Sequence, residues 1–358
     1  MNSFDYVRPA SIAEAVAAAS QPGSAYLAGG TNLLDLMKGG IARPGRLVDL
    51  NHLAGLDRIE ALPGGGMRIG ALTRNADLAH DPEFARRFPA VAEALLSGAS
   101  GQLRNAATVG GNILQRTRCA YFYDAASRCN KRQTGSGCEA QGGDTRSHAV
   151  LGWSESCIAT HPSDFCVPLV ALDAVVEIEG QAGRREVALE SFHRLPGDEP
   201  AQESVLAPGE LIVAIRLPAA AASFSAHARY LKLRERTSYA FAVVSAAAAL
   251  RTEEGRRGDG VRIVEARVAL GGVAAKPWRA RAAEELLVGS RLDQTAFRGA
   301  AEAALGDAKP SGDNAVKIEL ARCIVARALT LAAAGTPERL PALPASPFAT
   351  VPGALAHA

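Results

Sequence analysis

The sequence has no apolar run of the about eighteen residues that a membrane-spanning helix requires. Its first residues, MNSFDYVRPAS, lack the basic start and apolar segment of a signal peptide, so we expect none. Aromatic residues make up only 5% of the chain and the net charge is only +2, which argues against a nucleic-acid surface. Without a sign of export, six cysteines are expected as metal ligands or core thiols before disulfides. The composition indicates a soluble redox or metal protein.

At 358 residues the chain is long enough for two or three domains. Ser11 followed by Glu14 fits a capping box, so the run 12–19 is predicted to be a helix. We expect strands at 46–50, 67–73, 174–180, 184–192 and 210–218, and one helix over 82–99. Residues 218–224 are expected to be a loosely structured linker. Two or three strands within 227–274 then precede helices at 277–289, 294–305 and 314–332, which favours a C-terminal α+β region.

Two Gly-Gly pairs are the first candidates for a binding site. Gly29 and Gly30 follow a short apolar run, and Thr31 is expected to cap a helix that ends at residues 39–40. Free N–H groups and the absence of a Cβ at such a turn suit a phosphate. Gly110 and Gly111 repeat the pattern, so a diphosphate held from both sides is predicted. Neither pair fits GxGxxG with a ribose carboxylate, which disfavours a Rossmann fold.

Four cysteines lie within a segment that reads as an insertion, since removing residues 114–157 joins TVGGNI to IATHPSDF. They are Cys119, Cys129, Cys138 and Cys157. Disulfides, structural zinc and a 4Fe–4S cluster are three alternatives. The gaps of nine, eight and eighteen residues do not fit paired zinc ligands, whereas a cluster tolerates irregular spacing. An excess of Arg and Lys and the GSG at 135–137 also favour an anionic cluster. The other two cysteines, Cys166 and Cys323, are expected to be core thiols, and His148 and His161 structural.

Five collinear motifs resemble a known family. LAGGTNLL (27–34), QLRNAATVGGNI (102–113), HPSDF (161–165), LKLRERTSYAFAVV (231–244) and ALGGVAAKPWRA (269–280) are similar to the FAD-binding subunit of the molybdenum hydroxylases. The resemblance implies an α+β chain with a two-subdomain vanillyl-alcohol-oxidase (PCMH)-type FAD-binding fold and a C-terminal carbon monoxide dehydrogenase flavoprotein-type domain. The implied divisions are 1–57, 58–220 with a 4Fe–4S insertion at 114–158, 222–333, and an extended or flexible tail at 337–358.

The resemblance also implies a set of FAD-binding residues. One segment should wrap the diphosphate through main-chain amides: Leu27, Ala28, Gly29, Gly30, Thr31, Asn32, Leu33 and Leu34. A second should hold it from the opposite side: Thr108, Val109, Gly110, Gly111 and Asn112. Asp164 should bind sugar hydroxyls, Ile212 should pack near the flavin ring, and Lys232 should lie near the ring's polar edge. From the residues alone, Asp164 could instead cap the next helix, Ile212 could be core, and Lys232 an exposed strand residue.

The cysteine-bearing segment resembles that of the periplasmic-type aldehyde oxidoreductases, which implies a 4Fe–4S cluster held by the four cysteines. The implied role is electron transfer within a heterotrimer, from 2Fe–2S centres of a small subunit to FAD and on to an external acceptor. Substrate oxidation would belong to a molybdenum-binding large subunit. The alternatives are a 4-hydroxybenzoyl-CoA reductase-type subunit, a free-standing FAD oxidase and a zinc-stabilised assembly subunit. Export with a partner to the periplasm or a cytoplasmic location would both fit.

Overall fold

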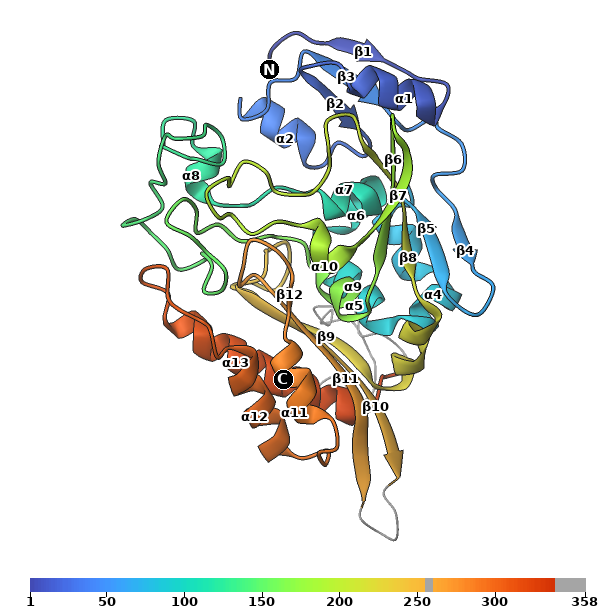
Figure 1. The fold of residues 1–358 in the computed structure, drawn as a ribbon, viewed down its shortest axis with the longest axis vertical. Helices are drawn as coiled ribbons and strands as arrows, with labels where there is room; N and C mark the ends of the chain where they lie inside the picture. The colour runs from blue at the N-terminus through green and yellow to red at the C-terminus, as the bar shows by residue number, and fades with distance from the viewer. Residues whose placement is uncertain (255–259, 339–358) are drawn as a thin grey trace.

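The computed structural model describes residues 1–254 and 260–338, which form three stacked tiers (Figure 1). The first tier is a parallel sheet in the order β1-β3-β2 with two helices. Its elements are β1 (Asp5–Val7), α1 (Ile12–Ala19), β2 (Ser24–Leu27), α2 (Leu33–Lys38) and β3 (Arg46–Asp49). The predicted helix over 12–19 is confirmed, and Ser11 Oγ accepts the N–H of Glu14 at 3.2 Å. Most of the predicted tail, from residue 339 on, lies outside the described residues.

The second tier is built on a five-stranded antiparallel sheet in the order β4-β5-β8-β6-β7. Its strands are β4 (Ile59–Ala61), β5 (Met67–Gly70), β6 (Val175–Gly180), β7 (Gly183–Ala188) and β8 (Leu211–Leu217). Its short helices are α3 (Asn75–His80), α4 (Pro82–Arg87), α5 (Pro89–Ser97), α6 (Gly101–Ala106), α7 (Val109–Ile113), α9 (Cys166–Ala171) and α10 (Leu189–Phe192). The cysteine lobe, defined as residues 114–158, projects from this tier and contains α8 (Ala120–Tyr123).

Two predicted elements of this tier are wrong in detail. The helix expected over 82–99 is two helices, because Pro89 cannot continue the hydrogen-bond ladder and disfavours helical backbone at Phe88, which has φ −130° and ψ 58°. The strand expected over 184–192 ends at Ala188, and α10 follows it. The structure also adds α3 and α6, which have only six residues each and carry no clear sequence period.

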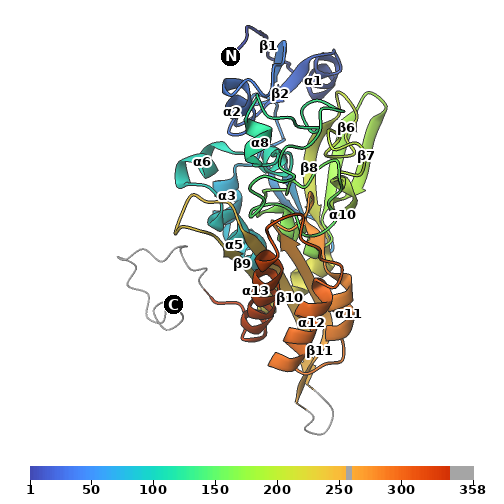
Figure 2. The same ribbon diagram turned by 90° about the vertical axis from the view of Figure 1, so that its left-hand side faces the viewer.

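The third tier is an antiparallel sheet in the order β12-β11-β10-β9 with three helices on one face (Figure 2). Its elements are β9 (Ala228–Leu233), β10 (Val244–Glu254), β11 (Val261–Gly271), β12 (Trp278–Arg279), α11 (Arg281–Leu287), α12 (Gln294–Ala304) and α13 (Val316–Ala333). The alanine-rich run of β10 buries both faces: Ala246 and Ala248 pack towards the helices, and Ala247 and Ala249 towards the second tier. The expected linker at 218–224 is instead part of a 3-10 helix, η1 (Ala219–His227).

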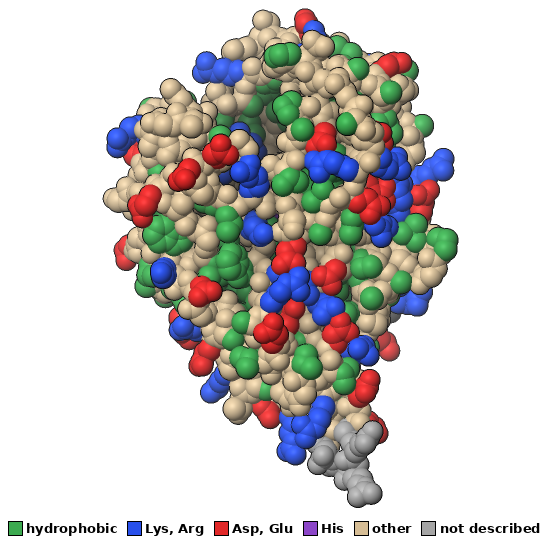
Figure 3. Space-filling view, in the orientation of Figure 1, with side chains coloured by type: hydrophobic (Ala, Val, Ile, Leu, Met, Phe, Trp, Pro, Cys, Tyr) green, Lys and Arg blue, Asp and Glu red, His purple; other side chains and the backbone are tan. Residues whose placement is uncertain are grey.

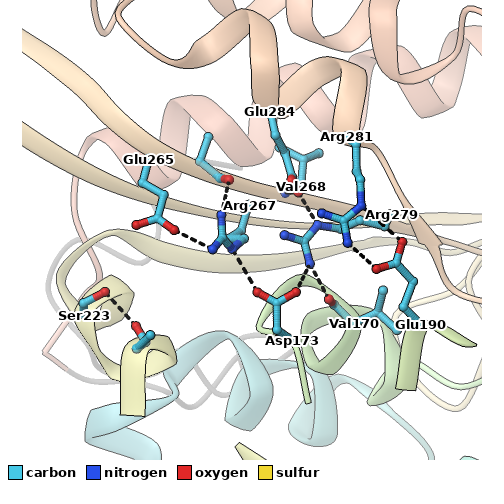
Figure 4. Close-up of polar contacts among 12 residues, drawn as sticks. Val170, Asp173, Glu190, Ser223, Glu265, Arg267, Val268, Arg279, Arg281 and Glu284 are labelled. Atoms are coloured by element: carbon cyan, nitrogen blue, oxygen red, sulfur yellow. Dashed lines mark hydrogen bonds and ion pairs between the residues drawn. The ribbon is translucent and has the colours of Figure 1, made fainter. Parts of the chain in front are cut away.

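An ion network centred on the buried Arg279 joins the second and third tiers (Figure 4). Arg279, whose side chain is only 2% exposed, donates to Asp173 at 3.0 Å and to the carbonyl of Val170 at 2.6 Å, and pairs with Glu284. Arg267 reaches the other oxygen of Asp173 at 3.4 Å. Because Asp173 and Val170 belong to the second tier, the network fixes the orientation of the third tier against it.

The surface carries charges of both signs. On the face drawn in Figure 3, Lys and Arg side chains are interspersed with Asp and Glu. Among the described residues, no helix combines the length and the apolar character that crossing a membrane requires.

Candidate functional site

The turn between β2 and α2 presents a row of main-chain donors to a cavity. Among the described residues, the N–H groups of residues 29–33 have no hydrogen-bond partner. Gly30 has a left-handed backbone with φ of 73°, which disfavours any residue with a Cβ. Successive free N–H groups at a tight turn form a concave site that suits an anion. The geometry of this first glycine segment therefore fits a diphosphate.

Asn32 links this turn to the cysteine lobe. The prediction that Thr31 caps α2 is wrong, because Asn32 occupies the cap position and makes no side-chain capping bond. Its Oδ1 instead accepts the main-chain N–H of Arg116 at 3.0 Å. Its Nδ2 is buried and has no partner in the described part of the chain, so it is a donor available to a ligand.

The second glycine pair uses its N–H groups within the protein. The N–H of Gly110 donates to the carbonyl of Ala71 at 2.9 Å, and that of Gly111 to Thr108 Oγ1 at 3.3 Å. The pair therefore lies inside α7 and is not a loop with free amides. A Cβ at Gly110 would lie 2.9 Å from that of Ala71, so glycine is required for close packing. The two pairs therefore differ: the first presents hydrogen-bond donors to the cavity, whereas the second allows α7 to pack closely against Ala71.

Two neighbouring cavities lie along these segments. The smaller, about 240 Å³ and here named the Ile212 cavity, is lined by the first glycine segment and by Ile212, which is 3% exposed. The larger, about 550 Å³ and named the Asp164 cavity, is lined by Asp164 and Lys232. Thr31, Asn32 and Gly111 line both. The larger cavity is in the size range of ligand sites, about 300–1,000 Å³.

Four buried polar atoms without a partner among the described residues make the Asp164 cavity suitable for a polar ligand. They are Asn32 Nδ2, Asn75 Oδ1, Arg104 Nε and Arg118 Nε, and all four residues line it. Buried polar groups without partners are uncommon, and each costs free energy unless a ligand or water satisfies it. Together with the free N–H groups of the first glycine segment, they fit the hydroxyls and phosphates of a dinucleotide. Asn75 carried no sequence signal, because it lies on a short helix outside the five motifs, and Arg104 lies within the motif 102–113 but was not singled out as a site residue.

Asp164 and Lys232 form a buried pair. Lys232 Nζ lies 2.8 Å from Asp164 Oδ2, and the hydroxyl of Tyr230 donates to Asp164 Oδ1 at 2.6 Å. The side chain of Lys232 is only 3% exposed, so it is not an exposed strand residue. Asp164 does not cap α9 through its side chain. Burial, and then the charge of Asp164, raise the pKa of Tyr230 well above its ordinary value. Lys232 thus lies with Asp164, in a different cavity from Ile212.

The HPS sequence before Asp164 holds α7 in place. His161 Nε2 contacts the carbonyl of Ile113 at 3.3 Å, and His193 Nε2 contacts the same carbonyl at 2.9 Å. The hydroxyl of Ser163 lies 2.7 Å from Asn112 Oδ1. Burial is the main cause that lowers the pKa of His193 to about 4 and that of His161 well below its ordinary value. Both rings are therefore neutral at neutral pH and act as structural clamps.

The four cysteines of the lobe are free thiols, and they lie close enough for the charge of one to shift the pKa of another. Burial raises the pKa of Cys119 to about 11, and the nearby Cys157 and Cys129 raise it further. Burial also raises the pKa of Cys157, which Lys131 opposes and Cys138 reinforces. Cys129 and Cys138 are partners in an antiparallel bridge. Buried thiols of raised pKa hold protons tightly, and a bound metal would displace these protons.

Several cationic side chains of the cysteine lobe make ion pairs or hydrogen bonds within the protein. Arg116 and Lys131 both pair with Glu203, at 2.5 Å and 3.0 Å. Arg132 donates to the carbonyls of Tyr121 and Phe122. The N–H of Gly137 donates to Asn130 Oδ1 at 2.8 Å, so this part of the GSG segment supports the lobe's own backbone.

The two remaining cysteines differ from each other. Cys166 is fully buried in the second-tier core, as predicted. The prediction that Cys323 is a core thiol is wrong, because it is exposed on α13 beside Glu319. Helical phase explains the difference, since Ala321, Ile324, Val325 and Ala328 form the buried stripe of α13.

Two known protein families match this chain, each over a different part of it. Residues 2–220 match the family described as the FAD binding domain in molybdopterin dehydrogenase. Residues 229–332 match the CO dehydrogenase flavoprotein C-terminal domain. These matches confirm the expected fold, an FAD-binding fold followed by an α+β flavoprotein domain.

The relatives span nearly the whole chain. The chain is 48% identical over 336 residues to the aldehyde oxidoreductase FAD-binding subunit PaoB of Escherichia coli (strain K12), covering 93% of this chain and 99% of that protein. It is 30% identical to the carbon monoxide dehydrogenase medium chain of Hydrogenophaga pseudoflava, covering 92% and 96%.

Two solved structures have a fold similar to that of this chain. Carbon monoxide dehydrogenase from Oligotropha carboxidovorans superposes with a TM-score of 0.73 at 28% identity, covering 94% of this chain and 99% of that chain. Quinoline 2-oxidoreductase from Pseudomonas putida 86 gives 0.70 at 26% identity, covering 93% and 98%. The chain therefore belongs to the FAD-binding medium subunits of the molybdenum hydroxylase family, and it is an oxidoreductase subunit.

Proposed function

We propose that this chain is the FAD- and 4Fe–4S-binding electron-transfer subunit of a heterotrimeric, molybdenum-containing aldehyde oxidoreductase. Its partners would be a molybdenum-cofactor-binding large subunit and a 2Fe–2S small subunit. FAD, when bound, supplies a two-electron store that also exchanges single electrons, which suits a junction between one-electron centres and an external acceptor. The 48% identity to a protein named as an aldehyde oxidoreductase FAD-binding subunit supports the aldehyde assignment.

The proposed FAD site follows the two cavities. Residues 27–34 hold the diphosphate through the free N–H groups of residues 29–33, supported by the exposed row of donors at this turn. Residues 108–112 form the opposite wall, where Gly111 leaves room for the ligand. Ile212 packs against the flavin ring, and Asp164 accepts hydrogen bonds from sugar hydroxyls. Lys232 holds Asp164 in place at 2.8 Å and contributes a cation to the same cavity.

The proposed cluster ligands are Cys119, Cys129, Cys138 and Cys157. One zinc ion would hold four sulfurs about 3.8 Å apart, given Zn–S bonds of about 2.3 Å. Among the described residues, no three of these sulfurs lie within 4.8 Å of one another, since His161, Cys166 and His193 form the only such group. A cubane cluster binds each thiolate at a different iron, so its four cysteine sulfurs lie farther apart than those of a zinc site. This spacing is the observation that favours iron–sulfur over zinc.

We also propose domain limits of 1–57, 58–220 with the cluster insertion at 114–158, and 222–333. The pairing of β4 with β5 from residue 59 on, and the start of β9 at residue 228, support them. The proposed location is the periplasm, reached by co-export with a partner subunit, or the cytoplasm. Fractionation of cells for the assembled complex distinguishes the two.

One measurement tests the cofactor assignment. The complex, prepared anaerobically, is assayed for FAD, iron and zinc per copy of this chain. We expect one FAD here and four irons beyond those of the small subunit. Four irons missing with zinc in their place would overturn the cluster, and absence of FAD would overturn the electron-transfer role. Aldehyde-dependent reduction by this chain purified alone would favour a free-standing oxidase instead.

A further inference from the structure

His148 lies against one of the proposed cluster ligands. Its Nε2 is 3.2 Å from the sulfur of Cys119, and the residue is only 3% exposed. Its other ring nitrogen, Nδ1, is buried and has no partner among the described residues. With iron bound, Cys119 would carry no proton, so the proton shared by this pair would belong to His148. The ring would then be an Nε2–H donor to the sulfur.

The position of His148 is set from the third tier. The carbonyl of His148 accepts from Lys317 Nζ at 2.8 Å and from Asn314 Nδ2 at 3.2 Å. Lys317 also donates to the carbonyl of Ser147 at 2.8 Å. Asn314 and Lys317 are buried, with exposures of 0% and 1%. Two fully buried side chains at the start of α13 thus hold the backbone of His148, which leaves its ring little freedom.

Lys317 has no acidic partner among the described residues, and burial lowers its pKa to about 7, so a nearby anion would favour its charged form. Within the described residues it bonds only to main-chain carbonyls, and no carboxylate lies within ion-pair distance. Burying a charge without a partner costs free energy, so such a site favours a nearby anion. The proposed cluster with four thiolates is anionic, and its ligand Cys119 contacts the residue that Lys317 holds.

We propose that His148 is a positioning residue that donates a hydrogen bond to the Cys119 sulfur and raises the reduction potential of the cluster. The inference rests on the proposed function, because it requires the cluster. Gain of one electron makes a cluster more negative without forming or breaking a bond. An N–H donor stabilises the more negative state more strongly, so the potential rises. His148 therefore helps the cluster to accept an electron.

Variants of the whole complex test this role. His148→Leu removes the donor, and His148→Gln keeps an N–H donor of similar reach. His80→Leu is the control, since His80 is exposed and, within the described residues, hydrogen-bonds only to the carbonyl of Ala76. The midpoint potential of the cluster is measured by a redox titration with EPR detection. We expect His148→Leu to shift it downward, His148→Gln to restore most of the shift and His80→Leu to leave it unchanged. An unchanged potential in His148→Leu, with four irons retained, would overturn the proposal.

A second measurement uses the unsubstituted protein and does not depend on variants that fold. Pulsed EPR on the reduced complex with ¹⁵N-labelled histidine should give a weak ¹⁵N coupling and an exchangeable proton that disappears in deuterium oxide. No coupling would overturn the hydrogen bond, and a large coupling, typical of a direct iron–nitrogen bond, would overturn the positioning role. Absence of these irons from the unsubstituted complex is a different result, because it overturns the proposed function itself.

Discussion

The side-chain oxygen of Asn32 accepts the main-chain N–H of Arg116 at 3.0 Å, which joins the first glycine segment to the cysteine lobe. The guanidinium of Arg116 also lies over the ring of Phe122, 4.6 Å from its centroid. Phe122 follows Cys119 by three residues and is fully buried. Asn32 and Arg116 therefore connect the proposed flavin site with the proposed cluster site. Because Asn32 itself lines both cavities, a substitution there should affect FAD binding more than iron content.

Asn32→Ala should weaken FAD binding by roughly fivefold, because it removes a buried donor in the cavity worth about 1 kcal/mol. Fluorescence titration of flavin-depleted protein measures the dissociation constant. Iron content serves as the internal control and should stay at the parent value. Equal affinity in the variant and the parent would contradict a ligand contact at Asn32.

Gly110→Val should cost the protein its flavin while leaving the iron in place. The added side chain would press on Ala71, whose Cβ is 2.9 Å away from a Cβ at this position, and displace α7 from the cleft wall. The ratio of flavin to protein after gel filtration measures the loss. Gly299→Ala is the matched control, since nothing lies within 4 Å of its Cβ on α12, and it should stabilise by about 0.5–1 kcal/mol. Full flavin content in Gly110→Val would show that the packing is not required.

Arg279→Leu should lower the free energy of unfolding by about 3–5 kcal/mol, because it leaves Glu284 buried without its partner. Chemical denaturation measures the change. The control is Arg322→Leu on α13, whose pair with Glu319 is exposed and should contribute less than about 1 kcal/mol. Similar losses in both variants would mean that burial of the network in Figure 4 carries no special weight.

Stability should fall as the pH drops from 7 to 4. The pKa of His193 is about 4 in the folded protein against 6.5 in the unfolded chain, so the unfolded chain binds the extra proton in this window. The free energy of unfolding should decrease by about 3 kcal/mol from this residue alone. His161 acts in the same direction. Denaturant midpoints across this range test it, and His193→Gln, although less stable, should show a shallower slope. Parallel slopes in variant and parent would refute the assignment.

Thiol labelling should report the cluster directly. In the loaded protein at neutral pH, we expect only Cys323 to react quickly, because it is exposed and Cys166 is fully buried. Removal of iron should add four slower thiols, since burial raises the pKa of Cys119 to about 11 and that of Cys157 as well. Cys323→Ser removes the fast reaction and identifies it. Fast labelling of the lobe in iron-containing protein would contradict its four cysteines as ligands.

Several features of this protein could be predicted from its sequence. Local signals were sufficient for the helix capped by Ser11, for the alternating strands, and for the tight turn at Gly30, because each depends on neighbouring residues. The resemblance of five motifs identified the family and the fold. The same local signals missed the break at Phe88, put the cap of α2 at Thr31 instead of Asn32, and predicted a buried Cys323.

Tertiary structure decided which of the candidate groups are available for binding. Both glycine pairs look alike in the sequence, yet the carbonyl of Ala71 accepts the N–H of Gly110, whereas the N–H groups of residues 29–33 have no partner within residues 1–254 and 260–338. Lys232 meets Asp164, and His148 meets Cys119, across 68 and 29 residues of chain. Such pairings arise only when distant segments pack together. Sequence thus determined the residues and turns of the site, and packing determined their hydrogen-bond partners, because a buried polar group must bond to whatever the fold places beside it.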